Sequence, residues 1–307
     1  MPINCQHDLR LRKEEGGCHK RYCNGKLRTT QDVILERKEF EVLLTACSEV
    51  SKLFPEGVCY IGGIAVYLHA KGTAETSALA EFTHDADLYI SMADMGDLRD
   101  IEEVTPNRRR SKHQMVKRGF EFDIYTERQA SLIVPYDQVL VHSKAFEGIR
   151  VASLEHLFVL KLEAFAVRKG SVKGDKDAKD LLRIAAVACG SDEGLRVELV
   201  SPYLRDEHKE LLSAVEQGPQ VMALAQGDAM AAKAIRQQFA AVAKRIMEAD
   251  AATQSMRKPP SIGVGLLATV GIANQTEGKA TKASKRSRKP QTRPGVRQPK
   301  SPTPTKG

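Results

Sequence analysis

Three aspartates carry the clearest chemical signal in this sequence. Asp85 and Asp87 are two residues apart in an apolar segment, so on a strand their side chains project from one face. Asp123 alternates with Phe122 and Ile124, which places it on the unburied face of another strand. If the strands are neighbours, the three carboxylates repel one another unless a cation lies between them. Such an oxygen-rich site suits a hard divalent ion that also holds phosphates, and Mg²⁺ is the expected cofactor.

A pair of glycines precedes these acids. Gly62 and Gly63 follow a short apolar strand and come directly before a helix that is expected to begin near Ile64. Bare backbone at a helix start can approach a phosphate closely and donate free N–H groups to it. A Gly-Gly pair alone says little, and an Asp-x-Asp pair also occurs on ordinary strand surfaces. The two patterns gain weight because they occur in order with a third acid.

The elements that must position these residues form an alternating pattern. Short β-branched or aromatic runs predict strands, and apolar residues at spacings of three and four predict helices. Together they predict a mixed α/β sheet domain with helices packed on it. The expected strands are residues 58–61, 84–91 and 119–125, and the expected helices are residues 31–53, 153–169, 175–189, 194–218 and 228–253.

The order of these motifs resembles a known superfamily. G-G-x-A-V at 62–66, T-x-D-x-D-L at 83–88 and the strand bearing Asp123 are similar to the DNA-polymerase-β-like nucleotidyltransferases. A helix with Lys161 and Arg168, followed by K-D-x-x-D-L at 176–181, resembles the AbiEii-type toxin nucleotidyltransferases of type IV toxin–antitoxin systems. The resemblance covers residues 60–182.

This resemblance implies a nucleotidyltransferase-type catalytic domain that transfers NMP from an NTP to an RNA acceptor, such as a tRNA end, or to a protein. It implies that Asp85 and Asp87 coordinate both metal ions, and that Asp123 binds one and helps to deprotonate the attacking hydroxyl. It also implies a possible antitoxin partner. The expected nucleotide-binding residues are Gly62, Gly63, Thr83, Lys161, Arg168 and Asp180.

Several alternatives remain open from the residues themselves. Lys161 and Arg168 could form the solvated face of an amphipathic helix, and Asp177 and Asp180 could pair only with nearby basic residues. The 21 residues between Gly63 and the first aspartate exceed the usual superfamily spacing and could displace the glycines. The motifs also fit a small-molecule nucleotidyltransferase of the aminoglycoside-modifying kind. Outside the enzymes, the alternative functions are a non-catalytic nucleic-acid-binding protein and an antitoxin-like partner.

A second feature is the uneven distribution of charge. The 307 residues have a formal net charge of +8, but residues 279–307 contain ten basic and no acidic residues, which leaves 37 basic against 39 acidic elsewhere. A tail of this composition favours nonspecific nucleic-acid binding, or a solubilising or antitoxin-contacting extension. Another basic group, Arg108–Arg110 with Lys112, Lys117 and Arg118, is either a solvated loop or a surface for triphosphate or RNA phosphates.

The expected organisation is a basic N-terminal arm at 1–30, a nucleotidyltransferase domain at 31–190, a helical subdomain at 191–256 and a disordered basic tail at 257–307. Six cysteines without an apolar leader favour a reducing cytoplasm over secretion. No segment predicts a membrane span. The arm contains irregularly spaced residues that are either a loosely ordered segment or zinc ligands, namely Cys5, His7, Cys18, His19 and Cys23.

Overall fold

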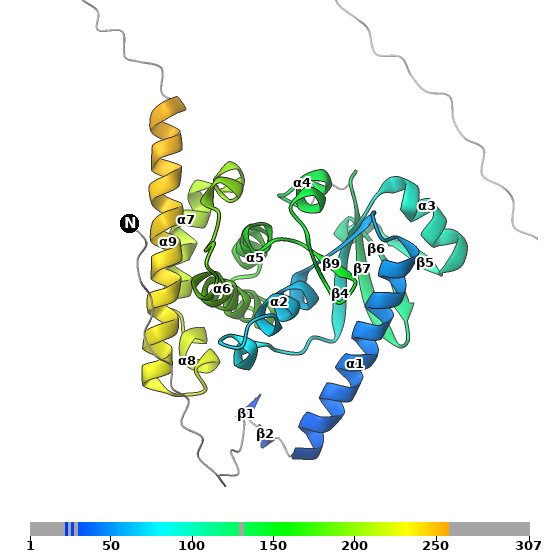
Figure 1. The fold of residues 1–307 in the computed structure, drawn as a ribbon, viewed down its shortest axis with the longest axis horizontal. Coiled ribbons are helices and arrows are strands. Elements are labelled where there is room, and N and C mark those ends of the chain that lie inside the picture. Colours follow the sequence, from blue (N-terminus) through cyan, green and yellow to red (C-terminus); the bar gives the residue numbers. More distant parts are fainter. Residues whose placement is uncertain (1–21, 24–25, 28–29, 129–131, 258–307) are drawn as a thin grey trace, which may run out of the picture. The chain divides into compact units, whose positions relative to one another are not determined.

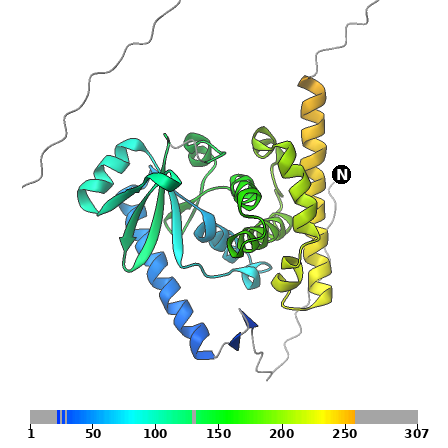
Figure 2. The same cartoon turned by 180° about the vertical axis from the view of Figure 1, so that it is seen from behind.

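The computed structural model describes residues 22–23, 26–27, 30–128 and 132–257. Of the possible zinc ligands in the N-terminal arm, Cys5, His7, Cys18 and His19 lie outside these residues, and the side chain of Cys23 is not described. The predicted basic tail lies outside them from residue 258 onward. Figure 1 shows the described part as a sheet beside a group of helices, and Figure 2 gives the view from behind. None of the described helices has the length and apolarity needed to cross a bilayer.

The core of the fold is a seven-stranded mixed sheet with the order β5-β6-β7-β4-β3-β9-β8. β4 pairs in parallel with β7, and β3 pairs in parallel with β9, whereas the other neighbours are antiparallel. The predicted mixed α/β class is therefore confirmed. The strands are β3 (Val58–Ile61), β4 (Asp85–Ile90), β5 (Val104–Asn107), β6 (Lys112–Lys117), β7 (Phe120–Thr126), β8 (Lys144–Phe146) and β9 (Ile149–Val151), with a separate hairpin of β1 (Tyr22–Cys23) and β2 (Lys26–Leu27).

Helices pack against this sheet and against one another. α2 (Gly62–Lys71) contacts β3 and β4 and also packs on α5 (Leu154–Arg168) and α6 (Val172–Gly190). α5 begins where Ser153 accepts a hydrogen bond from His156 N at 3.3 Å, which satisfies one donor of the first turn. The remaining helices on the sheet side are α1 (Thr30–Leu53), α3 (Met92–Ile101) and α4 (Tyr136–Val141), with 3₁₀ turns at Ser77–Leu79 and Arg108–Arg110.

Three further helices follow α6 and pack on it. α7 (Asp206–Glu216) and α8 (Gln220–Leu224) connect to the long α9 (Ala229–Arg257), which lies along α6 to α8. The prediction of one helix over 194–218 is wrong at its start. The chain forms two 3₁₀ turns there, Val197–Leu199 and Ser201–Tyr203, because Pro202 cannot donate to a preceding turn.

The other predicted elements are close to those observed. β3 has the predicted bounds, and β4, β7 and α5 each differ from the prediction by one residue at each end. α6 begins three residues earlier than predicted, since Ser171 caps it by accepting from Gly174 N at 3.1 Å. The basic segment taken as a possible loop instead forms β6 from Lys112 onward.

Candidate active site

The predicted carboxylates lie on adjacent parallel strands. In the register of β4 and β7, Asp87 pairs with Asp123 and Asp85 pairs with Glu121. Ala86 and Leu88, which alternate with the acids, are fully buried, so the acids share the opposite face of the sheet. We call this surface the carboxylate face. The sequence therefore predicted the side on which the acids project, and the pairing of β4 with β7 meets the condition that their strands be neighbours.

The glycine pair begins α2 directly beside these acids. Gly62 has a φ of +73°, a conformation that favours glycine, and a Cβ at this position would overlap the Asp87 carboxylate. A Cβ on Gly63 would come 3.0 Å from Thr83 Oγ1. The long connection to β4 therefore does not separate the glycines from the acids, because the chain returns through a 3₁₀ turn at Ser77–Leu79.

Asp85 is held by a hydroxyl and an ammonium group. Thr83 Oγ1 donates a hydrogen bond of 2.7 Å to Asp85 Oδ1. Lys176 Nζ, from α6, donates to Thr83 Oγ1 at 3.0 Å and lies 3.9 Å from Asp85 Oδ1. Burial raises the pKa of Asp85, but the hydrogen bond from Thr83 and the charge of Lys176 outweigh it, so the net shift is downward.

Asp123 is held from the neighbouring strand β6. Lys112 Nζ forms an ion pair with Asp123 Oδ2, and Gln114 Nε2 donates to Oδ1 at 2.9 Å. Gln114 is the cross-strand partner of Asp123, and Lys112 is two residues away on the same face. Both oxygens of this carboxylate are thus oriented by side chains of one strand.

Asp87 has the least compensated charge of the three. Burial raises its pKa to about 6, and the negative charges of Asp85 and Asp123 add to the rise, while Lys161 and Lys112 oppose it. A carboxylate crowded by two others in a desolvated place is one that a cation would stabilise. Oxygen is the only ligand atom that the three side chains offer, so the donor set fits a hard divalent ion such as Mg²⁺.

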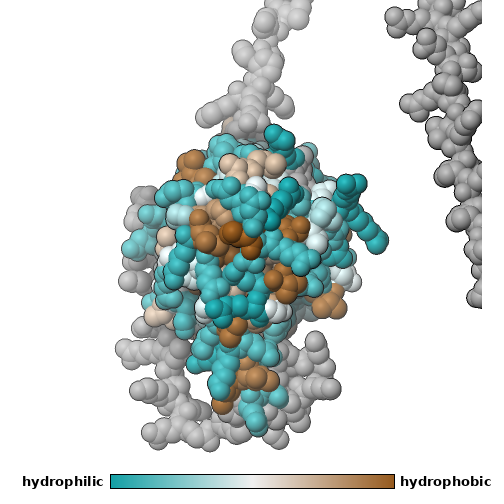
Figure 3. All heavy atoms as spheres, turned by 90° about the vertical axis from the view of Figure 1, so that its right-hand side faces the viewer, coloured by the Kyte–Doolittle hydropathy of each residue, from teal (hydrophilic) through white to brown (hydrophobic). Residues whose placement is uncertain are grey.

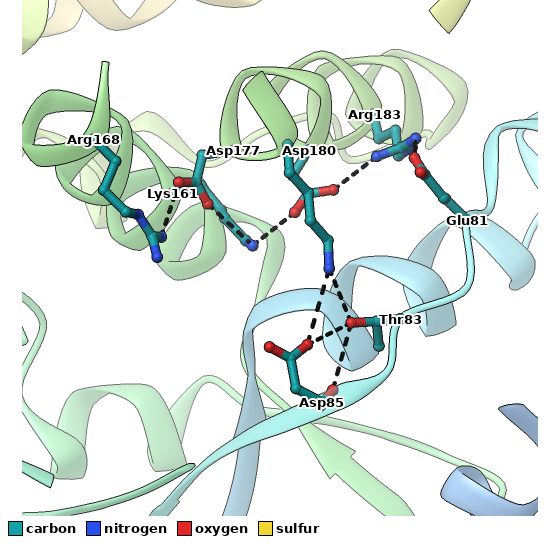
Figure 4. Close-up of polar contacts among 9 residues, drawn as sticks. Glu81, Thr83, Asp85, Lys161, Arg168, Asp177, Asp180 and Arg183 are labelled. Atoms are coloured by element: carbon teal, nitrogen blue, oxygen red, sulfur yellow. Dashed lines mark hydrogen bonds and ion pairs between the residues drawn. The ribbon is translucent and has the colours of Figure 1, made fainter. Parts of the chain in front are cut away.

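Behind the carboxylates, a row of alternating charges joins α5 to α6 (Figure 4). Lys161 Nζ lies 2.6 Å from Asp180 Oδ2 and 3.5 Å from Asp177 Oδ1. Arg168 extends the row to Asp177 at 2.8 Å, and Arg183 extends it from Asp180 at 2.8 Å and on to Glu81. The acids of α6 are thus bridged to α5 and to the connection that leads into β4.

This row bears on the alternatives left open by the sequence. Lys161 is only 8% exposed, so it does not lie on a solvated helix face. Asp180 does pair locally with Arg183, but it also binds Lys161 on the other helix. Burial lowers the pKa of Lys161, whereas Asp180 and Asp177 raise it and prevail, so the ammonium is charged.

A second acidic group offers potential metal ligands. Among the described residues, the one trio of potential ligands with its atoms within 4.8 Å of one another is Glu163, Glu207 and His208. His208 Nδ1 accepts from the backbone of Arg205 at 3.2 Å, and its Nε2 lies 2.8 Å from Glu163. The Arg205 side chain also pairs with both glutamates. These groups already satisfy one another, so we assign them a structural role.

Three residues at the site were missed in the sequence. Lys176 had a signal, since it is the lysine of the K-D-x-x-D-L motif. Lys112 belongs to the basic segment, but its reach to Asp123 depends on β6 being a strand. Gln114 has no signal in the sequence, because only strand pairing brings it to the carboxylate.

No family model and no curated protein matches this sequence. Similar solved structures include an antigenic nucleotidyltransferase-like protein from Paracoccidioides brasiliensis, with TM-score 0.40 and 16% identity over 62% of this chain and 92% of that one. The Megavirus polyadenylate synthase gives 0.40 and 12% over 66% and 47%. A putative nucleotidyltransferase from H. pylori gives 0.39 and 13% over 74% and 99%. These values are too low to assign this chain to a family.

Proposed function

We propose that this protein is a Mg²⁺-dependent nucleotidyltransferase that transfers a nucleoside monophosphate from an NTP to an acceptor hydroxyl and releases pyrophosphate. The observation that carries the proposal is the carboxylate face, where Asp85, Asp87 and Asp123 lie beside a helix start with a positive φ at Gly62. Carboxylates supply metal ligands, and free N–H groups at a helix start supply phosphate contacts. Their conjunction fits phosphate chemistry better than either does alone.

In the proposed reaction, the acceptor oxygen attacks the α-phosphate, and the bond from that phosphorus to the oxygen bridging to the β-phosphate breaks. The electron pair leaves with pyrophosphate. Bound Mg²⁺ would neutralise the triphosphate and polarise the α-phosphate. Asp85 and Asp87 would hold the ion, and Asp123 would take the proton from the attacking hydroxyl. Lys112 and Gln114 fix the orientation of Asp123 before substrate arrives.

Backbone N–H groups at the start of α2 and the ammonium group of Lys176 would meet the triphosphate. Gly62 and Gly63 lack side chains where α2 begins, so a phosphate can approach their backbone. Lys176 lies on the Asp85 side with its side chain 40% exposed, so its ammonium is accessible to the leaving pyrophosphate. The side chains of Lys161, Arg168 and Asp180 would line the same side of the proposed triphosphate site. A direct phosphate contact by Lys161 or Arg168 stays a prediction.

The acceptor and the biological role are proposed from the resemblance. An RNA such as a tRNA end, or a protein hydroxyl, is the proposed acceptor, and a toxin held in check by an antitoxin protein is the proposed role. Inducible expression tests the toxin role: growth arrest by the wild type but not by Asp85→Asn would support it, and equal growth of both strains would refute it.

A labelling assay tests the enzymatic proposal. The full chain is incubated with each α-³²P-labelled NTP, Mg²⁺, and either total RNA, cell protein or an aminoglycoside. We expect a labelled macromolecule and released pyrophosphate with wild type, and loss of both with Asp85→Asn or Asp87→Asn. Asp97→Asn, an exposed acid on α3, is the matched control and should retain activity. A labelled antibiotic would favour the small-molecule alternative, and equal labelling by the Asp85 variant would refute the proposal.

A further inference from the structure

The carboxylate face continues beyond the three aspartates to the edge of the sheet. Strand register places Asp123 next to Gln114 of β6, and Gln114 next to Thr105 of β5. Val116 and Glu121, each two residues further along its strand, form another cross-strand pair on this face. Both are exposed, with Val116 at 66%. This part of the face is therefore open to solvent and leads directly to Asp123.

A hollow of about 330 Å³ lies on this open part. Its volume is at the lower end of the range for small-molecule sites, roughly 300–1,000 Å³. Gln114 belongs both to the hollow and to the hydrogen bond that holds Asp123. A group in the hollow would thus be next to the proposed base. The lining residues are Glu103, Thr105, Gln114, Met115, Val116 and Glu121.

The turn between β5 and β6 carries three consecutive arginines, and we call Arg108–Arg110 the arginine turn. All three side chains are exposed, and none forms an ion pair with another residue that the structure describes. The neighbouring basic residues differ, because Lys112 pairs with Asp123 and Lys117 pairs with Glu102. The arginine turn is therefore a concentration of available positive charge at the rim of the site.

Hydrogen bonds connect this turn to Asp123. The Asn107 side chain accepts from Arg110 N at 3.3 Å and donates to Gln114 Oε1 at 2.9 Å. Gln114 in turn donates to Asp123. Ser111 closes the turn in the left-handed region, with a φ of 49°. The backbone of the arginine turn is therefore connected through Asn107 and Gln114 to the carboxylate, while the three guanidinium groups stay exposed.

The side of the molecule on which β5 lies exposes mainly polar residues among those that the structure describes. Figure 3 shows the right-hand side of Figure 1, where α3 and β5 lie, and this side is mostly hydrophilic with apolar residues in small separate groups. Specific recognition on this side would therefore depend on charge and hydrogen bonds rather than on a large apolar area.

We propose that the arginine turn and the adjacent hollow bind the end of a single-stranded nucleic acid as the acceptor. The inference rests on the proposed function, since it names the substrate class of that site. Arginines bind successive backbone phosphates without reading sequence. Glu103 and Glu121 repel phosphate but accept hydrogen bonds from sugar hydroxyls and base N–H groups, so the hollow takes the terminal nucleoside. The end hydroxyl then lies on the face that carries Asp123.

The test is binding of a 5′-labelled, single-stranded RNA of about 12 nucleotides with a free 3′ hydroxyl, measured by fluorescence anisotropy without NTP. The full chain is compared with the triple variant Arg108→Gln/Arg109→Gln/Arg110→Gln. The matched control removes the same charge from exposed lysines of α1 and α9, Lys38→Gln/Lys233→Gln/Lys244→Gln. All substitutions are at exposed positions, and circular dichroism checks that each variant is folded.

We expect the arginine variant to raise Kd at least tenfold at low salt, with less than a twofold change in the control. Its slope of log K against log salt should be shallower by about 2, since each lost phosphate contact on a single strand contributes roughly 0.7. Equal weakening in both variants would overturn the proposal, and so would equal competition by polyglutamate, because the surface would then be a general anion site.

A second measurement locates the terminal nucleoside. An RNA that ends in 4-thiouridine is photocrosslinked to the protein, and the attached peptide is identified by mass spectrometry. A crosslink within residues 103–121 supports the proposal, and a crosslink found only elsewhere overturns it. The outcome is separable from the proposed function, because loss of nucleotide transfer with intact binding and crosslinking would refute catalysis while leaving the docking surface in place.

Discussion

Replacement of Lys161 by methionine tests the charge row that joins α5 to α6. The substitution keeps most of the side-chain volume and removes the cation that lies 2.6 Å from Asp180 and 3.5 Å from Asp177. Removing one member of a buried ion pair costs about 3–5 kcal/mol, because an uncompensated charge stays buried. Each acid keeps an arginine here, so we expect the lower end, about 3 kcal/mol.

The assay is urea unfolding followed by circular dichroism. A loss of this size lowers the midpoint by about 1 M or more, given an m-value of roughly 1–3 kcal/mol/M. Lys173→Met is the control, because Lys173 is an exposed lysine of α6, the helix that carries Asp177 and Asp180, and its change should stay within about 0.5 kcal/mol. An unchanged midpoint in the Lys161 variant would refute the reasoning that these buried ion pairs stabilise the fold.

The pH dependence gives an independent check on the same variant. Burial raises the pKa of Asp180, but Lys161 and Arg183 outweigh it, so the native pKa is below the ordinary value. Its stabilising contribution is therefore present above the unfolded pKa and is lost as the pH falls. Without Lys161, burial of the charged acid becomes a penalty that protonation relieves. The stability difference between wild type and variant should narrow from pH 7 to pH 4, and a constant difference would contradict the reasoning.

Three further predictions concern a glycine, a histidine and a cysteine. Gly62→Ala should lower the free energy of unfolding by at least about 1 kcal/mol and abolish nucleotide transfer, because of its positive φ and the overlap with Asp87. Gly96→Ala, in an open place on α3, is the control and should be neutral or stabilising in thermal unfolding. Burial lowers the pKa of His69 to about 4, so the unfolded chain binds a proton there more readily than the folded chain. The free energy of unfolding should therefore fall as the pH decreases from about 6.5 to 4, by up to about 3 kcal/mol. Urea titrations of His69→Gln should show a weaker dependence of that free energy on pH. Burial raises the pKa of the Cys59 thiol to about 12, so iodoacetamide at pH 8 should label it only after unfolding, and rapid labelling of the native protein, read by mass spectrometry, would contradict this burial.

The sequence by itself determined the local features of the site. Alternation of acids with apolar residues set the face on which Asp85, Asp87 and Asp123 project, since strand side chains have a period of two. Spacings of three and four predicted α5, and Ser153 marked its start. Both patterns arise from neighbours along the chain, so no tertiary information was needed.

Only the tertiary structure decided which side chains meet the acids. Gln114 and Lys112 reach Asp123 because β6 pairs antiparallel with β7, and Lys176 reaches Asp85 because α6 packs near β4. The separation along the chain is 9 positions for Gln114 and Asp123 and 91 for Lys176 and Asp85, and local periodicity contains no information on such pairings. The arginine turn likewise gained meaning only when hydrogen bonds through Asn107 connected it to the carboxylate face, since charge in a sequence has no position until the strands that carry it are paired.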